Sequence, residues 1–337
     1  MKNKNLIATI VALVVLVVVA VFFNQKQDGN KQETEATSTE KQIKIGVLQY
    51  VTHDSLDQIY QGIKEGLKES GYDEADNLTI DFMNAEGNQS QVQTMSKKLV
   101  DNGNQLLIGI ATPATQGLAN ATSDLPIIMG AISDPVGSKL VADLEKPGAN
   151  ITGVSNRQPV EKDVALIQAV LPEAKTIGVL YSSNEDNSKA QVARFKEEAE
   201  KVGLKVEEFA IPSSNEIAAT VEVASSKVDA LFTPLDNTIA SAFSTVVSVA
   251  NKSKKPIFTS VEDMVKAGGI ASISQNQFEL GRTTGKMAAQ VLDGANPATT
   301  PVTIFTEGEI ILNQKVADEL GITLSKEVLD SAVRVIK

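Results

Sequence analysis

The chain has 337 residues, of which 42% are hydrophobic and 22% charged, a composition typical of about two folded domains that excludes wholesale disorder. It has no cysteine and a single histidine, His53, so disulfides, thiolate metal sites, cysteine nucleophiles and histidine clusters are excluded. Lys and Arg total 31 against 42 Asp and Glu. The net charge of −11 argues against binding nucleic acid and favours a small ligand.

The first 24 residues read as a membrane segment. Residues 6–23 are apolar except for Thr9, and Lys2 and Lys4 precede them, which predicts a spanning helix with its N-terminus in the cytoplasm. No pair of small residues marks a cleavage site, so an uncleaved anchor is favoured over the alternative, a removed signal peptide. Residues 25–42 are polar and aperiodic, and predict a flexible tether. We therefore expect the remainder on the outer face of the cell membrane.

From residue 43 onward, short apolar segments alternate with amphipathic ones, which predicts parallel sheets with helices on both faces. The predicted strands are residues 43–49, 78–83, 105–110, 126–131, 175–181, 204–209, 228–233, 255–259 and 270–274, with an extended piece at 302–305. The predicted helices include residues 55–70, 90–102, 188–202 and 279–293. Several of these helices begin at Ser or Asn and are followed by Gly.

Three short motifs occur twice, in the same order and at similar spacing. They are IGVL at residues 45–48 and 177–180, Thr-Pro at 112–113 and 233–234, and Pro-Ile at 126–127 and 256–257. This repetition predicts two similar α/β lobes. We expect lobe one to comprise residues 43–153 and 272–300, and lobe two residues 154–271 and 301–337. Three crossovers between the lobes would form a hinge that closes a cleft on a ligand.

Ligands of open α/β sheets bind at the carboxyl ends of the strands, which directs attention to the polar loops there. The residues from Thr112 to Thr115 resemble a helix start, whose free N–H groups suit a carboxylate; an ordinary capped helix is the alternative. Asp236 follows a strand of the second lobe and is a candidate for a ligand ammonium, or simply a helix cap with Asn237.

Aromatic and titratable residues in the same loops have two interpretations each. Tyr50 and Tyr181 follow the two IGVL strands, so they either sandwich a flat ligand group across the cleft or pack against helices. His53 lies in the first cleft loop and is read as a hydrogen-bonding group, since no second histidine relays protons.

Nothing in the sequence supports an enzyme. The GxSxG, GxxxxGK[ST], GxGxxG and HExxH motifs are all missing, and no metal or cofactor is expected. An enzyme that used cleft acids such as Glu86, Asp134 or Glu185 would be the alternative, but their spacing predicts no paired-acid chemistry.

Six segments resemble, in order, the ABC-transporter substrate-binding family typified by tryptophan-transporter binding proteins of Gram-positive bacteria. The segments are IGVLQYVTHDSLD, GIATPATQGLA, MGAISDPVGSKLV, NITGVSN, IGVLYSSNEDNS and PLDNTIAS. The resemblance implies a periplasmic-binding-protein type I fold, with two Rossmann-like lobes, three crossovers and an aromatic amino acid, tryptophan first, bound between them. It also implies a monomer whose partners are an ABC permease and its ATPase.

The family's cleft motifs map onto a defined set of residues. Together with the cleft-loop candidates, the expected ligand-binding residues are Gln49, Tyr50, His53, Ser55, Asn84, Glu86, Thr112, Ala114, Thr115, Asp134, Tyr181, Ser182, Ser183, Glu185, Asn187, Ser188, Asp236 and Asn237. The chain departs from the family in lacking a lipidated cysteine, which leaves residues 6–23 as the tether, and in carrying Asp54 where relatives often have proline.

Other readings stay open at this point. A binding protein for a branched amino acid or a nucleoside would have the same fold, and a ligand-sensing domain would share the cleft. A sensor is disfavoured because the expected anchor leaves only about five residues in the cytoplasm.

Overall fold

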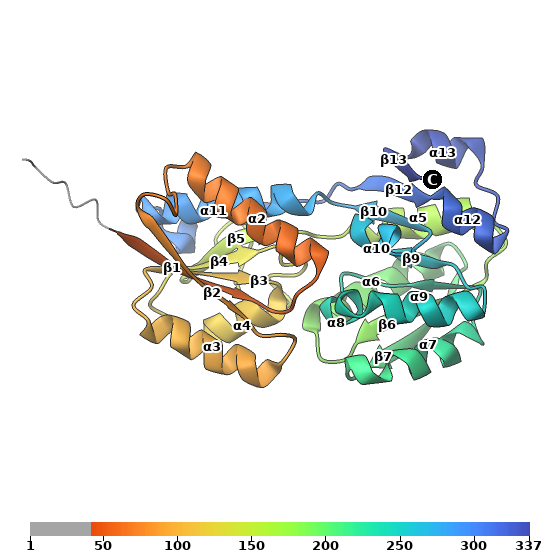
Figure 1. Ribbon diagram of the computed structural model, residues 1–337, viewed down its shortest axis with the longest axis horizontal. Coiled ribbons are helices and arrows are strands. Elements are labelled where there is room, and N and C mark those ends of the chain that lie inside the picture. Colours follow the sequence, from red (N-terminus) through yellow and green to blue (C-terminus); the bar gives the residue numbers. More distant parts are fainter. Residues whose placement is uncertain (1–41) are drawn as a thin grey trace, which may run out of the picture. The chain divides into compact units, whose positions relative to one another are not determined.

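Two separate sheets form from the alternating segments of residues 42–337, which are the residues that the computed structural model describes (Figure 1). The predicted anchor at residues 6–23 and the tether up to residue 41 lie outside them. Within residues 42–337, no helix is both long and apolar enough to cross a membrane.

The first sheet has six strands in the order β11-β5-β4-β3-β1-β2, all parallel. Its strands are β1 (Ile43–Gln49), β2 (Leu78–Asn84), β3 (Leu106–Ile110), β4 (Ile127–Gly130), β5 (Ile151–Ser155) and β11 (Thr303–Ile304). The helices α2 (Asp54–Glu69) and α11 (Gln277–Leu292) cover one face, and α3 (Gln89–Asp101) and α4 (Thr112–Ala121) cover the other (Figure 1). The inner strands β3 and β4 are wholly buried, as their continuous apolar runs require.

The second sheet has seven strands in the order β13-β12-β10-β9-β8-β6-β7, and the only antiparallel pair among its strands joins β10 to β12. Its strands are β6 (Thr176–Ser182), β7 (Lys205–Ile211), β8 (Ala230–Phe232), β9 (Ile257–Thr259), β10 (Ala271–Ser274), β12 (Glu309–Asn313) and β13 (Arg334–Ile336). Its helices are α5 (Val160–Val170), α6 (Asp186–Lys201), α7 (Ile217–Ser225), α8 (Asn237–Ser241), α9 (Phe243–Lys252), α10 (Glu262–Lys266), α12 (Gln314–Leu320) and α13 (Lys326–Ser331). Short 3₁₀ turns lie at Ser214–Glu216 and Pro297–Thr299.

The predicted α/β architecture with two mostly parallel sheets is confirmed. Three strands, β5, β12 and β13, were missing from the expectation. β5 has the sequence ITGVS, in which Gly153 and the polar residues weaken the strand pattern, yet Gly153 lies so close to Met129 that an added Cβ would be 2.4 Å from its backbone. This segment becomes a strand by pairing with β4 on one side and β11 on the other.

The chain passes between the two sheets three times, after Ser155, after Ser274 and after Ile304. The expected lobe boundaries lay after residues 153, 271 and 300. The last difference has a clear cause, because Thr303 and Ile304 pair with β5 and therefore belong to the first sheet.

One side chain ties the three crossovers together. Gln275 is buried, and its amide nitrogen donates to the carbonyl oxygens of Arg157 (3.2 Å) and Phe305 (3.0 Å), which lie in the first and third crossovers. Gln275 itself lies in the second crossover. Its two hydrogen bonds therefore connect the three crossover segments that form the hinge.

The helices α2 and α11 pack almost backbone against backbone. Glycines line the contact on both helices: a Cβ added at Gly66 would lie 2.0 Å from the carbonyl oxygen of Arg282, and one added at Gly281 would lie 2.0 Å from that of Ile59. Glu69 closes one end of the contact, where hydrogen bonds from Arg282 and Lys286 lower its pKa to about 2. The contact thus joins α11, which follows the second crossover, to α2, which lies near the start of the fold.

Replacing Gly66 with alanine tests this contact. An exposed helical glycine gains up to about 1 kcal/mol of stability on replacement by alanine. Here the Cβ must push α11 away, so we expect the free energy of unfolding in urea to fall by about 1–3 kcal/mol. Glu65→Ala, on the exposed face of α2, is the control and should change stability by less than about 0.5 kcal/mol. Equal stability of Gly66→Ala and wild type would refute the close packing.

Candidate ligand-binding site

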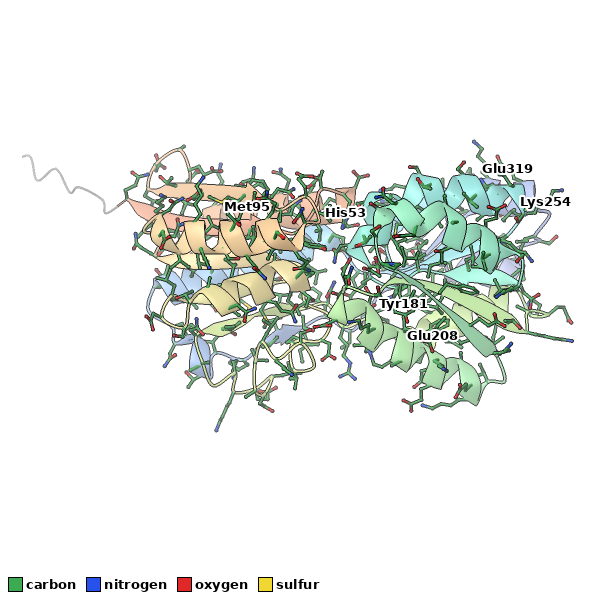
Figure 2. All side chains as sticks on the ribbon, turned by 90° about the horizontal axis from the view of Figure 1, so that it is seen from below. His53, Met95, Tyr181, Glu208, Lys254 and Glu319 are labelled. Carbon is green, nitrogen blue, oxygen red and sulfur yellow. The ribbon has the colours of Figure 1, made fainter. Side chains whose placement is uncertain are left out.

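A pocket lined by both lobes lies between the carboxyl ends of the strands of the two sheets. Figure 2 shows His53 at this junction. The first lobe contributes His53, Ser55, Leu56, Ile59, Ala111, Thr112, Ala131 and Ser133. The second lobe contributes Asn187, Pro234, Leu235, Asp236, Asn237, Ala240, Val261 and Met264; Asn156 of the first crossover and Gln277, the first residue of α11, complete the lining.

The pocket has both apolar and polar lining residues. Leu56 and Ile59 come from the first turns of α2, and Val261 and Met264 come from the segment around α10, so aliphatic side chains of both lobes line the space. Such walls accommodate a flat apolar group without hydrogen-bonding demands.

Two alanines at the pocket have backbone conformations that normally favour glycine. Ala111 has φ 74° and Ala131 has φ 61°, and they directly follow β3 and β4. Non-glycine residues in this region cost about 1–3 kcal/mol and concentrate at binding sites. Ala111 is also the residue before α4, so its conformation turns the start of that helix toward the pocket. Neither alanine was singled out from the sequence.

The start of α4 supplies donors. Thr112 lines the pocket, and Pro113 follows it at the first turn, as predicted. Pro113 has no N–H, and the N–H of Thr115 donates to the carbonyl oxygen of Ala111 at 3.1 Å, so the N–H groups of Thr112 and Ala114 are the ones left for an anion. Thr115 does not take part, because its hydroxyl lies 3.0 Å from the carbonyl oxygen of Gly109 and 3.1 Å from that of Ala111. Ala114, which is fully buried, does not line the pocket either.

Asp236 is the acid of the pocket, and it also caps α8. One carboxylate oxygen accepts from the N–H of Ile239 (2.9 Å), and the other accepts from the N–H of Ser182 (2.5 Å). Burial raises the pKa of Asp236 to about 7, and the nearby charge of Glu185 adds to the increase. A cation in the pocket would offset both effects, so the site favours a positively charged group beside Asp236.

Glu185 lies beside Asp236 and stabilises the start of α8. It is fully buried and accepts from the backbone N–H and side-chain amide of Asn237 (3.2 and 2.5 Å) and from the N–H and hydroxyl of Thr238 (2.9 and 2.8 Å). Its carboxylate therefore holds the start of α8 in place and does not reach the pocket. Ser188, also fully buried, lies beside Asp236 and hydrogen-bonds to Asn187 (3.3 Å).

Two buried amide oxygens at the pocket have no partner. The Oδ1 atoms of Asn156 and Asn187 are inaccessible and receive no hydrogen bond from residues 42–337. The orientation of Asn187 is set by its amide nitrogen, which donates to the carbonyl oxygen of Leu235 at 2.9 Å. Buried polar atoms almost always have partners, so these oxygens are vacant acceptors for a ligand. Asn156 was missed in the sequence because it lies in a crossover rather than at a predicted strand end.

Several expected site residues stabilise the loops instead. Gln49 donates to the carbonyl oxygen of Val51 and to Asp57, and Asn84 donates to Thr52, so both hold the loop that precedes α2. Glu86 is exposed, and the N–H of Ser183 donates to the carbonyl oxygen of Ile211. None of Gln49, Asn84, Glu86 and Ser183 lines the pocket. Asp134 lines a neighbouring cavity.

The expected sandwich of Tyr50 and Tyr181 is not formed. The hydroxyl of Tyr50 donates to the carbonyl oxygen of Gly87 within the first lobe. Tyr181 lies on the face of β6 that packs against α6, beside Glu208 of β7, as Figure 2 shows. The alternation of side chains along β6 places Tyr181 on a helix-covered face, whereas its neighbour Leu180 points to the opposite one.

Hydrogen bonds join the two lobes around the pocket. Ser55 and Gln58, in the first turns of α2, both donate to one carboxylate oxygen of Asp263 (3.1 and 2.7 Å). The ring nitrogen Nε2 of His53 lies 3.4 Å from the side-chain oxygen of Asn237. These contacts define a closed arrangement of the lobes. Within the described residues there is no cluster of acidic or histidine side chains that could hold a metal.

Two lobes joined by three crossovers, with a polar and apolar pocket at the facing sheet edges, define a solute-binding protein of the periplasmic-binding-protein type I fold. The sequence pattern of the family described as "ABC transporter substrate binding protein" matches residues 44–336, so the chain belongs to that family. The predicted family and the prediction of a binding protein rather than an enzyme are confirmed.

Relatives with known ligands support a closer comparison. The chain is 38% identical over 314 residues to a tyrosine-binding protein of Clostridioides difficile, covering 93% of this chain and 91% of that one. It is 60% identical to the ABC domain from Streptococcus pneumoniae solved in complex with L-Trp, covering 88% of this chain and all of the other, with a TM-score of 0.87.

Two further solved structures show how the arrangement of the lobes affects the TM-score at equal sequence identity. Both are 36% identical to this chain: a conserved domain protein from Vibrio cholerae has a TM-score of 0.86, and the ligand-free, open structure of a substrate-binding protein from Clostridium difficile has 0.66. Each comparison covers 88% of this chain and at least 99% of the other. Since identity is equal, the lower score reflects the open arrangement, and the lobes of this chain are closed.

Removing His53 tests its burial. Burial lowers the pKa of His53 below its ordinary value of 6.5. The unfolded chain therefore binds a proton near pH 6.5 that the folded chain does not, and the free energy of unfolding should fall as the pH drops below 6.5, by up to about 1.4 kcal/mol per pH unit. His53→Gln should lose this part of the slope in urea unfolding at pH 7.5, 6.5 and 5.5. Parallel wild-type and variant profiles would contradict the burial.

Proposed function

We propose that the protein is the extracellular binding component of an ABC importer. It captures an aromatic amino acid, tryptophan first and then tyrosine or phenylalanine, by closure of its lobes, and it delivers the ligand to the permease and its ATPase. The segment at residues 6–23 would tether it to the outer face of the membrane. The observation that carries the proposal is the pocket itself, which places an acid, a helix start and an apolar wall around one small space.

The polar side of the pocket matches an amino-acid head group. An ammonium has three donors. Asp236 supplies a carboxylate acceptor, and the vacant side-chain oxygens of Asn156 and Asn187 supply two more. The carboxylate of the ligand would meet the free N–H groups at the start of α4 and the hydroxyl of Thr112. The two charges of the ligand are therefore met by opposite charges of the site.

The remaining space is apolar and fits the side chain of the ligand. Leu56, Ile59, Val261 and Met264 come from both lobes, so an aromatic ring between them would bury area on each lobe at once. The tyrosine-binding relative and the complex with L-Trp support an aromatic side chain in this position.

Closure would be driven by the ligand. The bonds from Ser55 and Gln58 to Asp263 exist only when the lobes meet, but both groups can hydrogen-bond to water when the lobes part, so these bonds alone favour closure weakly. A ligand that contacts both walls supplies the difference in free energy that populates the closed state, which the permease would recognise.

Calorimetric titration tests the ligand. The protein is freed of carried-over ligand by unfolding and refolding, then titrated with tryptophan, tyrosine, phenylalanine, leucine and a nucleoside. Micromolar or tighter binding of one aromatic amino acid is expected. Because the chain has no tryptophan, fluorescence of bound tryptophan gives an independent readout. Heat from leucine or the nucleoside alone would overturn the ligand class. Uptake of labelled amino acid by cells lacking the gene tests delivery.

Asp236→Asn tests the ammonium site. The variant keeps the shape of the side chain but removes its charge, so the affinity for the amino acid should fall by at least about ten-fold. Asp229→Asn is the matched control: Asp229 also accepts two backbone N–H bonds, from Lys175 (2.8 Å) and Thr176 (2.9 Å), but lies outside the pocket. Unchanged affinity in Asp236→Asn would make Asp236 a helix cap only.

A further inference from the structure

Two of the four arginines in the chain have no counter-ion among residues 42–337. Arg282 forms ion pairs with Glu69 and Glu279, and Arg334 pairs with Glu262. Within residues 42–337, Arg157 and Arg194 form no ion pair, and neither guanidinium donates a hydrogen bond to the protein. This is unexpected in a chain with a net charge of −11, in which carboxylates outnumber cations.

These two arginines line a cavity of about 210 Å³ beside the ligand pocket. Arg157 lies in the first crossover and Arg194 on α6, whereas Ser133, Val136 and Ile304 on the opposite side belong to the first lobe. Ser133 lines both spaces, so the cavity adjoins the ligand pocket. The cavity is thus built from both lobes and the hinge.

The guanidinium of Arg194 is poorly satisfied. One terminal nitrogen, Nη2, is buried without any hydrogen-bond partner. Burial lowers the pKa of Arg194, and the positive charge of Arg157 lowers it further, so the two guanidinium groups are close enough to repel each other. The nearby acids Asp134, Glu161 and Asp163 raise this pKa, but burial and the second guanidinium outweigh them. Leaving a buried donor of a charged group unpaired is costly, and a bound anion would remove that cost.

The acid in the cavity wall does not fill this need. Asp134 uses one oxygen to accept the N–H of Gly137 at 2.9 Å, which holds the turn after β4. It forms no ion pair with either arginine. The acids of α6 near the other side of the arginine pair, Glu197 and Glu198, lie in a second cavity and also remain outside ion-pair distance.

We propose that this cavity binds a small oxyanion, a carboxylate or a phosphate, between Arg157 and Arg194, and that the bound anion favours the closed form. Guanidinium groups offer paired N–H donors that match the oxygens of both anions. Val136 and Ile304 are partly exposed aliphatic side chains in the same cavity, so an organic acid with a short apolar group also fits.

Anion binding is coupled to lobe closure because both lobes contribute residues to the cavity. Opening the hinge separates Arg194 from the loop of the first lobe that carries Ser133, to which Gln191 of the same helix donates at 3.4 Å in the closed form. An anion held between the arginines and the Ser133 loop contacts both lobes only in the closed form, so its binding favours closure. By linkage, the anion then raises the affinity for the amino acid, and this second effect rests on the proposed function.

Calorimetry of the full-length protein in a non-ionic detergent tests the site. Inorganic phosphate and acetate are titrated separately, in a Tris-chloride buffer, first without and then with tyrosine or tryptophan. We expect at least one anion to bind at one site per chain, and about ten-fold weaker binding in Arg194→Gln and Arg157→Gln. Arg194→Lys keeps the charge but loses the paired donors, and should fall between wild type and Arg194→Gln.

The control is Lys97→Gln, which removes one charge from the exposed face of α3, where Lys97 has no ion pair. Anion binding should be unchanged in this variant. Absence of saturable binding of both anions to wild type, or equal binding by all variants, would overturn the proposal. Anion binding is measured without any amino acid, so failure to bind an aromatic amino acid would refute the proposed function and leave this site standing. Unchanged amino-acid affinity on adding the anion would refute the coupling.

Discussion

The close contact between α2 and α11 is the constraint on which the rest of the structure depends. His53 immediately precedes α2, and Ser55 and Gln58 lie in its first turns; His53 and Ser55 line the pocket, and Ser55 and Gln58 bond to the second lobe. α11 begins directly after Gln275, the residue that ties the three crossovers. Because glycines allow the two helices to touch through their backbones, the position of the cleft wall is fixed relative to the hinge. A wider spacing between α2 and α11 would shift the cleft wall relative to the hinge.

The cleft itself is arranged by ordinary helix-capping chemistry. Asp236 caps α8, and Glu185 holds the start of the same helix, so two buried carboxylates exist because backbone N–H groups surround them. The raised pKa of Asp236 shows that this environment still lacks positive charge. Under the proposed function, the ammonium of the ligand would supply the positive charge that this network lacks. The side-chain oxygens of Asn156 and Asn187 similarly lack hydrogen-bond donors within residues 42–337.

The alternation of segments and the recurring motifs were sufficient to predict the two-sheet α/β architecture and the loops that form the cleft. Loop position also predicted Asp236 and Thr112 at the pocket, because the carboxyl ends of parallel strands share an edge. It did not predict Ala111 or Asn156, whose roles depend on a backbone angle and on a crossover. Tyr181 was misplaced because a residue at a strand end can still point into a helix-covered face. Short strands such as β5 take their conformation from neighbours and leave a weak local pattern.

The three crossovers have a consequence for how the chain is made. The first sheet is completed only by α11 and β11, and the second only by β12 and β13, the last of which ends at Ile336. A ribosome that synthesises the chain from its N-terminus therefore releases neither half with a complete core until nearly all of the protein exists. The apolar surface that α11 covers in the first half therefore stays uncovered until late in synthesis.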